Sequence, residues 1–178
     1  MITHYFSPPY ILPLVEIVGG PETDKEVVAR AVQWLRSIRM TPVTLKKYVP
    51  GFIVNRLQRA VQREVLYMVD EGMADPIEID KAVKATLGIR LPILGFFAKY
   101  DFTGLDMVAR GLRAPSIGLA NEERVSPVMN LVEKGHLGVK SGKGFYDYSD
   151  RPLSGVLRER DVKLIEILQL LRKLGEVE

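Results

Sequence analysis

The sequence predicts a mainly α-helical protein whose helices follow a short unit of strand, strand, helix and strand. From Pro50 onward, apolar residues recur at spacings of three and four along most of the chain, which is the period of an amphipathic helix. Before Pro50, two short extended runs lie on either side of Pro8-Pro9, and the β-branched segment 41–45 follows a helical stretch. We therefore expect two parts, residues 1–47 and residues 48–178.

Three strands are predicted in the first part. One surrounds His4, and the next covers 12–18, where alternation of side chains places Glu16 among aliphatic neighbours on one face. The segment 41–45 is bounded by Pro42 and by lysines, which is typical of an edge strand. With a single helix to cover it, such a small sheet would leave one face bare.

The helix of the first part has a start signal and an apolar stripe. Thr23 and Glu26 have the spacing of a capping box, so the helix should begin there and end near Ile38. Trp34 lies on the stripe and is expected in the core.

The second part is predicted to be helix after helix. A long helix should follow Pro50-Gly51 and end at Gly72, and Asp75-Pro76 should start a helix that stops at Gly88. Further helical pieces are expected over 91–100, 102–112, 122–134 with a break at Ser126-Pro127, and 157–174, with an ordered loop over 135–148.

Composition excludes several classes of protein. The chain has 178 residues, of which 47% are hydrophobic and 26% charged, so it is globular and not disordered. It has no cysteine, which excludes disulfides and thiolate chemistry, and two histidines, which argues against a multi-histidine metal centre. A net charge of +3 with interspersed acids gives no support for nucleic-acid binding. Since neither a signal peptide nor a membrane span is evident, we expect no membrane partner and a cytoplasmic location.

The glycine-rich segment Gly138–Gly144 does not match a phosphate-binding loop. Its spacing fits neither the Walker pattern nor Gly-x-Gly-x-x-Gly, and an aromatic cluster follows it instead of an obvious helix. We interpret it as a structural turn.

His4 and Glu16 are the first candidates for chemistry. They lie on two extended runs joined by a turn, so a carboxylate could accept the N–H of a neutral imidazole and fix its tautomer. The alternative is that Glu16 faces water and His4 belongs to a frayed terminus. Spacing alone favours this alternative, because loosely spaced His–Glu pairs are common by chance.

Asn55, Lys46 and Lys47 are further candidates. The Asn55 amide, near the start of a helix, could point toward a cleft, or it could be a solvated residue near a helix end. Lys46 and Lys47 could meet an anionic ligand between the two parts, or they could be a solvated pair that protects an edge strand.

Several ordered motifs together resemble the 3-hydroxyacyl-CoA dehydrogenases over roughly residues 1–150. They are His4-Tyr-Phe-Ser-Pro-Pro-Tyr-Ile-Leu-Pro-Leu-Val-Glu16, Pro50-Gly-Phe-Ile-Val-Asn55-Arg-Leu, Val69-Asp-Glu-Gly72 with Ile79-Asp80, Asp101-Phe-Thr-Gly-Leu-Asp106, and Lys140-Ser-Gly-Lys-Gly-Phe-Tyr-Asp-Tyr148. This agreement reverses the preference that spacing alone gives for His4 and Glu16.

The resemblance implies a site, a cofactor and a fold. His4 would be the general base that takes the proton of a 3-hydroxyl while hydride passes to NAD⁺, Glu16 would orient it, and Asn55 would polarise the substrate oxygen. Residues 1–47 would be the end of an NAD-binding Rossmann domain. Residues 48–178 would be a helical dimerisation and substrate-binding domain, like that of 6-phosphogluconate dehydrogenase.

The chain departs from the family pattern at three places. The family's cofactor domain with its glycine fingerprint should precede His4, so most of the NAD site is absent and a separate N-terminal Rossmann subunit is a possible partner. Ser7 replaces the asparagine of an Asn-Pro-Pro motif, at a position assigned to substrate binding with Lys46 and Lys47. The Gly-Pro-hydrophobic-Glu motif appears as Gly95-Phe-Phe-Ala98, without its carboxylate. We therefore expect the chain alone to be inactive.

Three functions stay open. The first is the C-terminal portion of an NAD-dependent dehydrogenase of 3-hydroxyacyl-CoA, in fatty acid β-oxidation. The second is a non-catalytic helical module that dimerises and binds acyl-CoA. The third is a sugar-acid dehydrogenase of the L-gulonate type, related to lambda-crystallin, whose His-x-x-x-Pro-Pro and Phe-x-x-Asn-Arg-Leu elements also match. In each case the apolar stripes lead us to expect a homodimer.

Overall fold

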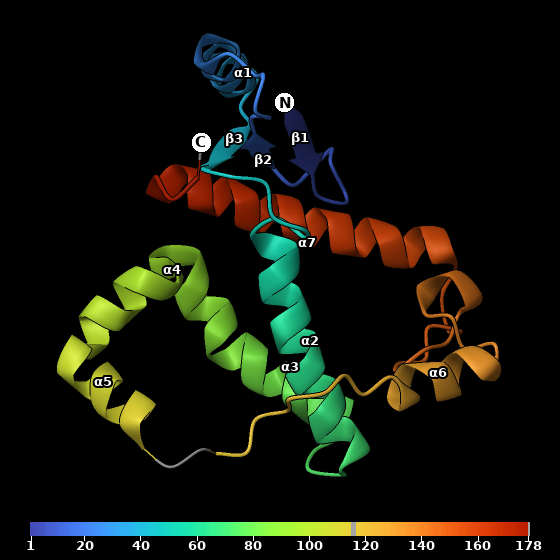
Figure 1. Cartoon of the computed structure of the whole chain (residues 1–178). Coiled ribbons are helices and arrows are strands. Elements are labelled where there is room, and N and C mark those ends of the chain that lie inside the picture. The colour runs from blue at the N-terminus through green and yellow to red at the C-terminus, as the bar shows by residue number, and fades with distance from the viewer. Residues whose placement is uncertain (115–116, 178) are drawn as a thin grey trace. The chain divides into compact units, whose positions relative to one another are not determined.

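The structure is a computed structural model that describes residues 1–114 and 117–177. It is mainly helical with one small sheet, as predicted (Figure 1). In chain order the elements are β1 (Ile2–Tyr5), β2 (Leu14–Val18), α1 (Lys25–Ser37), β3 (Thr41–Leu45), α2 (Val54–Asp70), α3 (Pro76–Ala85), α4 (Leu87–Thr103), α5 (Leu105–Arg113), α6 (Ser126–Glu133), the short 3₁₀ helix η1 (Val139–Ser141) and α7 (Leu153–Leu174).

The chain divides into two compact units. Unit 1 comprises Met1–Arg59 together with the chain from Arg158 onward, and unit 2 comprises Ala60–Leu157. The division falls within α2 and within α7, so each of these helices contributes to both units.

β2 is the central strand of the sheet in unit 1. β1 pairs with it antiparallel and β3 parallel, in the order β1-β2-β3. The register places His4 directly opposite Glu16. Because residues opposite each other on neighbouring strands share a face, the two side chains project to the same side of the sheet.

The core of unit 1 lies between β2 and α1. Val15 and Ile17, on one face of β2, are fully buried against Leu35 of α1, and the partly buried hydrophobic residues Val28, Val32 and Met40 pack around them. Glu16 and Val18, on the opposite face, are also buried. The middle strand is thus covered on both sides.

Two predictions for α1 were wrong. Asp24, and not Thr23, caps the helix, because its carboxylate accepts the N–H of Glu26 at 2.9 Å. Thr23 Oγ1 accepts the N–H of Gly20 instead and closes the preceding turn. Trp34 was expected in the core but is 59% exposed, since the helix turns the neighbouring Leu35 toward the sheet.

The helices of unit 2 begin and end near the predicted residues, with two exceptions: the junction of α3 and α4, and residues 122–125, which are not helical, so that α6 begins at Ser126. α2 ends at Asp70, and Gly72 follows with φ +65° as the predicted C′ glycine. Gly88 does not stop α3, which already ends at Ala85; Gly88 lies inside α4, which instead bends at Gly95 (φ +62°). A single glycine in a helix is tolerated, so its presence alone does not mark an end.

The loop after α6 is the structural turn predicted for Gly138–Gly144. Ser141 Oγ accepts the N–H of Leu137 at 2.7 Å and lies 2.9 Å from the carbonyl of Lys143. A Cβ on Gly144 would lie 2.8 Å from Gly138 Cα, so the two glycines allow a close approach of backbones.

The longest helix, α7, begins at Leu153, somewhat before the predicted start. Within residues 1–114 and 117–177, none of the helices combines the length and the apolar character needed to span a membrane.

Candidate active site

His4 and Glu16 form a hydrogen-bonded pair in unit 1. His4 Nδ1 lies 2.9 Å from Glu16 Oε2, and the Glu16 residue is fully buried while the His4 side chain is 28% exposed. An ionised carboxylate only accepts hydrogen bonds, so Nδ1 carries the proton of the neutral imidazole. Nε2 then has the free lone pair, as a proton acceptor requires.

The other oxygen of Glu16 holds the start of α2. Oε1 accepts the backbone N–H of Ile53 at 2.9 Å and that of Val54 at 3.0 Å. These N–H groups have no partner within the helix, so a carboxylate that accepts them satisfies the helix start and suits its positive end. Glu16 therefore joins the imidazole, the central strand and α2 at one point.

Aromatic rings surround the imidazole of His4. Phe52 stacks on it with ring centroids 4.8 Å apart, and Phe6 meets it edge-on at 4.7 Å. Tyr48 in turn contacts Phe52 edge-on at 5.9 Å. Sequence reasoning gave these rings no role, although Phe6 and Phe52 both belong to the motifs that contain His4 and Asn55.

The other candidate residues belong to the same unit as this pair and are exposed. Asn55 directly follows Val54, whose N–H binds Glu16, so its backbone belongs to the first turn of α2. Ser7 follows β1, and its peptide bond to Pro8 is cis. Lys46 and Lys47 lie in the segment between β3 and α2.

The pair can do one kind of chemistry by itself, which is proton transfer at Nε2 of His4. In the described part of the chain, no three His, Asp or Glu side chains gather into a metal site.

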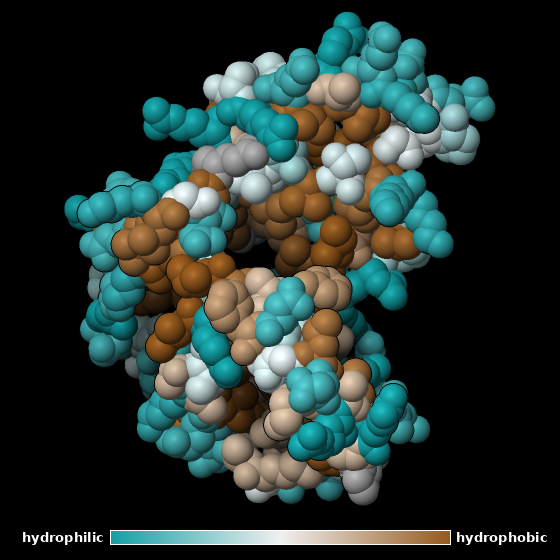
Figure 2. Space-filling model, turned by 90° about the vertical axis from the view of Figure 1, so that its left-hand side faces the viewer, coloured by the Kyte–Doolittle hydropathy of each residue, from teal (hydrophilic) through white to brown (hydrophobic). Residues whose placement is uncertain are grey.

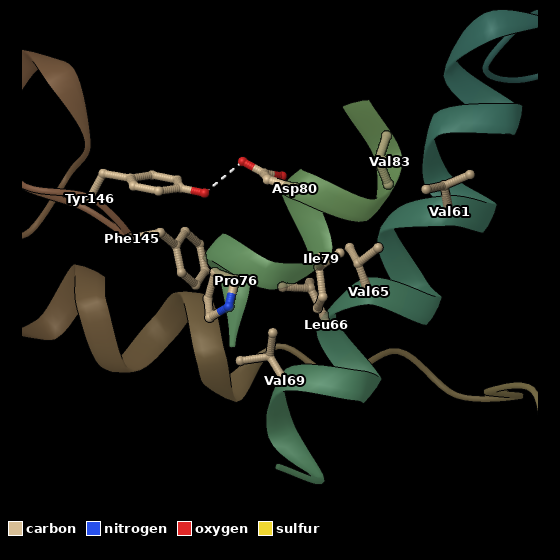
Figure 3. A pocket seen from close by; sticks show the side chains of 10 residues that line it. All are labelled: Val61, Val65, Leu66, Val69, Pro76, Ile79, Asp80, Val83, Phe145 and Tyr146. Atoms are coloured by element: carbon tan, nitrogen blue, oxygen red, sulfur yellow. Dashed lines mark hydrogen bonds between the residues drawn. The ribbon is translucent and has the colours of Figure 1, made fainter. Parts of the chain in front are cut away.

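Unit 2 contains a pocket of about 330 Å³ between α2, α3 and the loop after η1 (Figure 3). Its walls are mostly apolar, and the Tyr146 hydroxyl donates a hydrogen bond to Asp80 at 2.7 Å beside them. This bond, together with the loss of hydration, raises the pKa of Tyr146 to about 12. The lining residues are Val61, Val65, Leu66, Val69, Pro76, Ile79, Asp80, Val83, Phe145 and Tyr146.

The sequence matches two family models, which together cover most of residues 1–148. Residues 1–48 match the 3-hydroxyacyl-CoA dehydrogenase NAD binding domain, and residues 51–148 match the 3-hydroxyacyl-CoA dehydrogenase C-terminal domain. The chain belongs to the 3-hydroxyacyl-CoA dehydrogenase family. It is therefore a member of a family of NAD-dependent oxidoreductases.

The names of curated relatives point to different substrates. The chain is 32% identical over 169 residues to 5-formyl-3-hydroxy-2-methylpyridine 4-carboxylate 5-dehydrogenase of Mesorhizobium japonicum, covering 94% of the chain and 55% of the relative. It is 34% identical over 173 residues to L-carnitine dehydrogenase of Burkholderia mallei, covering 94% of the chain and 52% of the relative. The chain thus spans about half the length of these relatives.

Solved structures of the family have the same fold. A crystal structure of a 5-formyl-3-hydroxy-2-methylpyridine 4-carboxylic acid 5-dehydrogenase, described as NAD⁺-dependent, matches with a TM-score of 0.87 at 32% identity, over 96% of this chain and 55% of that one. A 3-hydroxyacyl-CoA dehydrogenase from Archaeoglobus fulgidus matches with a TM-score of 0.55 at 31% identity, over 98% and 58%.

The turn before α1 does not form a cradle for the phosphates of NAD, the cofactor of the family. A dinucleotide pyrophosphate is held at a glycine-rich turn by the free N–H groups of a helix start. The turn before α1 has Gly19 and Gly20, but the helix start carries the Asp24 carboxylate, which already accepts an N–H and would repel a phosphate. We therefore assign no part of NAD to these residues and derive only the proton transfer.

Proposed function

We propose that this chain carries the proton-transfer site of an NAD-dependent dehydrogenase, with His4 as the general base and Glu16 as the residue that orients it. The single observation that carries this proposal is the bond from His4 Nδ1 to the buried Glu16, which leaves Nε2 as the proton acceptor. In the oxidation of a substrate hydroxyl, Nε2 takes the hydroxyl proton; in the reverse direction it returns a proton to the carbonyl oxygen.

Asn55 is proposed to polarise the substrate oxygen. Its place in the first turn of α2 supports this role, because the same turn is tied to Glu16 and therefore to the base. An amide N–H₂ is a suitable donor to an oxygen that gains negative charge during the reaction. Ser7, Lys46 and Lys47 are proposed as further substrate contacts, and the cationic lysines suit an anionic group such as a phosphate of coenzyme A.

We propose a 3-hydroxyacyl-CoA as the substrate, with fatty acid β-oxidation in the cytoplasm as the setting. The match of residues 51–148 to the C-terminal domain of the family supports it. L-Carnitine is a second candidate, because several relatives named L-carnitine dehydrogenase match most of the chain at 32–34% identity. A sugar acid of the L-gulonate type is the third.

We propose the same division of the chain as the sequence predicts. Residues 1–47 would close an NAD-binding Rossmann domain, and residues 48–178 would form a helical domain of the 6-phosphogluconate dehydrogenase type. The two family matches, which meet between residues 48 and 51, support this boundary.

A homodimer is part of the proposal. Among the described residues of unit 2, only Ala120 is buried, and Phe97, Phe102 and Leu112 are each at least 80% exposed. Figure 2 shows hydrophobic side chains at the surface of the face that it draws. Apolar surface of this kind on a globular unit is normally covered by a partner.

The test is NAD⁺-dependent oxidation of 3-hydroxybutyryl-CoA, L-carnitine and L-gulonate. We expect the chain mixed with the N-terminal NAD-binding domain of a family member to reduce NAD⁺ with 3-hydroxybutyryl-CoA, and His4→Ala to abolish the reaction. A mixture that stays inactive with all three substrates would contradict the proposal.

Calorimetry distinguishes the remaining alternative, a non-catalytic module. Such a module would bind an acyl-CoA with its affinity unchanged by His4→Ala, and no mixture would turn over.

A further inference from the structure

We propose that Phe52 is a positioning residue for the His4–Glu16 pair, acting through its backbone on Glu16 and through its ring on His4. The inference rests on the proposed role of His4 as a proton acceptor. It goes beyond that role because it names what fixes the direction in which the acceptor points.

The backbone of Phe52 is in a conformation that its side chain disfavours. Gly51 and Phe52 both have positive φ, at +79° and +50°. Glycine adopts this left-handed region freely, but a bulky residue rarely does, and such strain persists only where the surroundings impose it. The N–H of Phe52 closes a turn on the Val49 carbonyl at 3.1 Å. The next two N–H groups along the chain, of Ile53 and Val54, are the ones that reach Glu16 Oε1.

The ring of Phe52 restrains a rotation of the His4 imidazole that the hydrogen bond to Glu16 does not prevent. One hydrogen bond at Nδ1 fixes one edge of the imidazole but lets the ring turn about the line between Nδ1 and Oε2. Phe52 lies against the face of the imidazole with an angle of 24° between the ring planes, and this contact opposes such a turn. Phe6 makes an edge contact with the same imidazole, and Tyr48 makes an edge contact with the ring of Phe52. The direction of Nε2 is therefore set by Glu16 and Phe52 together.

Three variants of the full chain separate the two roles. Phe52→Gly permits the left-handed backbone without strain and removes the ring. Phe52→Leu keeps a bulky side chain and the strained backbone but has no flat ring. Phe52→Tyr keeps both the strained backbone and the flat ring. Trp34→Leu, on α1 of the same unit, is the control for loss of an exposed aromatic ring.

The readout is the NMR spectrum of the His4 imidazole, with hydrogen exchange of the Ile53 and Val54 amides alongside it. For Phe52→Gly we expect the amides to stay protected, while the ring-current shift of His4 disappears and its Nδ1 proton exchanges at least tenfold faster. Phe52→Leu should lose the same His4 signature, and Phe52→Tyr and Trp34→Leu should retain it. Where activity is measurable, Phe52→Gly should lower kcat at least tenfold with little change in KM.

Unchanged His4 signals in both Phe52→Gly and Phe52→Leu would overturn the inference. If Phe52→Leu fails to fold, Phe52→Gly decides alone. The outcome is independent of turnover: if the wild-type chain shows the His4 signature but its mixture with the N-terminal NAD-binding domain oxidises none of the three substrates, the proposed function is refuted and the assignment of Phe52 stays intact.

Discussion

At the scale of single residues, Glu16 connects the site to the fold. Its two oxygens accept three hydrogen bonds from two elements, with His4 on one and the N–H groups of Ile53 and Val54 on the other. Each of these groups is a donor, so the carboxylate is the only common side chain that can satisfy all three at once without a change of tautomer.

Glu16→Gln should therefore invert the tautomer of His4. The amide oxygen can still accept from Ile53 and Val54, which leaves the NH₂ group to face Nδ1 as a donor. Nδ1 must then accept, and the proton moves to Nε2, where it blocks the proton acceptor. Nitrogen NMR of the imidazole measures the tautomer directly, and Glu22→Gln, at an exposed position, is the control. A variant that retains the Nδ1–H form would contradict this assignment of donors.

Residue identity alone could suggest His4 and Glu16 but could not decide between contact and exposure. The register of β1 on β2 decides it, because it sets the two residues opposite each other. The amide groups of Ile53 and Val54 were unpredictable for a different reason: every residue has a backbone N–H, so no side-chain type marks them.

At the scale of elements, the backbones of Gly138 and Gly144 approach each other closely in the loop after α6, and a substitution at Gly144 tests this approach. In Gly144→Ala the new Cβ would meet backbone atoms of Gly138 at 2.8 and 3.1 Å, and backbone cannot move aside cheaply. We expect a loss of about 1–3 kcal/mol in the free energy of unfolding.

Gly155→Ala, in the first turn of α7, is the matched control. Its Cβ would make only ordinary contacts with Pro152 at 3.7 and 3.9 Å, so the variant should be neutral or up to about 1 kcal/mol more stable. Chemical denaturation measures both. Equal effects of the two substitutions would argue against the tight loop.

Tyr146 should make the attachment of its loop to α3 dependent on pH. Its pKa is raised from the ordinary 10.0 to about 12, chiefly by the bond to Asp80. The phenol is favoured in the folded state, so its stabilising contribution is complete below pH 10 and is lost as the pH rises toward 12.

Spectrophotometric titration of wild type against Tyr146→Phe isolates this phenol (Figure 3). The difference curve should titrate well above 10.0, the ordinary pKa of a tyrosine. A Tyr146 phenol that ionises near pH 10 would contradict the hydrogen bond to Asp80.

The start of α3 and the end of α2 were predictable because their signals are local, whereas the buried face of α1 was not. Asp75-Pro76 precedes the start of α3, and Gly72 follows the end of α2 with a positive φ, both as predicted. Each signal depends only on residues within one turn of the chain. Trp34 and Leu35 lie side by side on α1, and only the direction from which the sheet approaches decides which of them is buried. That direction depends on tertiary packing, and the spacing of apolar residues along the helix does not determine it.

At the scale of the whole molecule, the distribution of buried residues differs between the units. Unit 1 has a core around β2, while the helices of unit 2 keep large apolar side chains exposed, as far as the described residues extend. The proposed homodimer would cover this surface.

Light scattering tests the homodimer. We expect a mass near twice the 20.0 kDa of the chain, and a shift toward the single-chain mass for Leu112→Lys, at a position on α5 that is 83% exposed. A new charge in a covered apolar contact is costly, whereas Trp34→Lys on α1 of unit 1 should leave the mass unchanged. A wild-type chain that is monomeric in dilute buffer would contradict the proposed homodimer.

The proposed role of His4 as acceptor of the substrate proton is tested by the rate of NAD⁺ reduction in His4→Gln. The measurement uses the active mixture with the N-terminal domain, and unfolding is followed in parallel to establish that the variant is folded. General base catalysis accounts for a factor of about 10²–10⁴, so kcat should fall at least about a hundredfold in His4→Gln. A folded His4→Gln protein that retains kcat within twofold of wild type would contradict the claim.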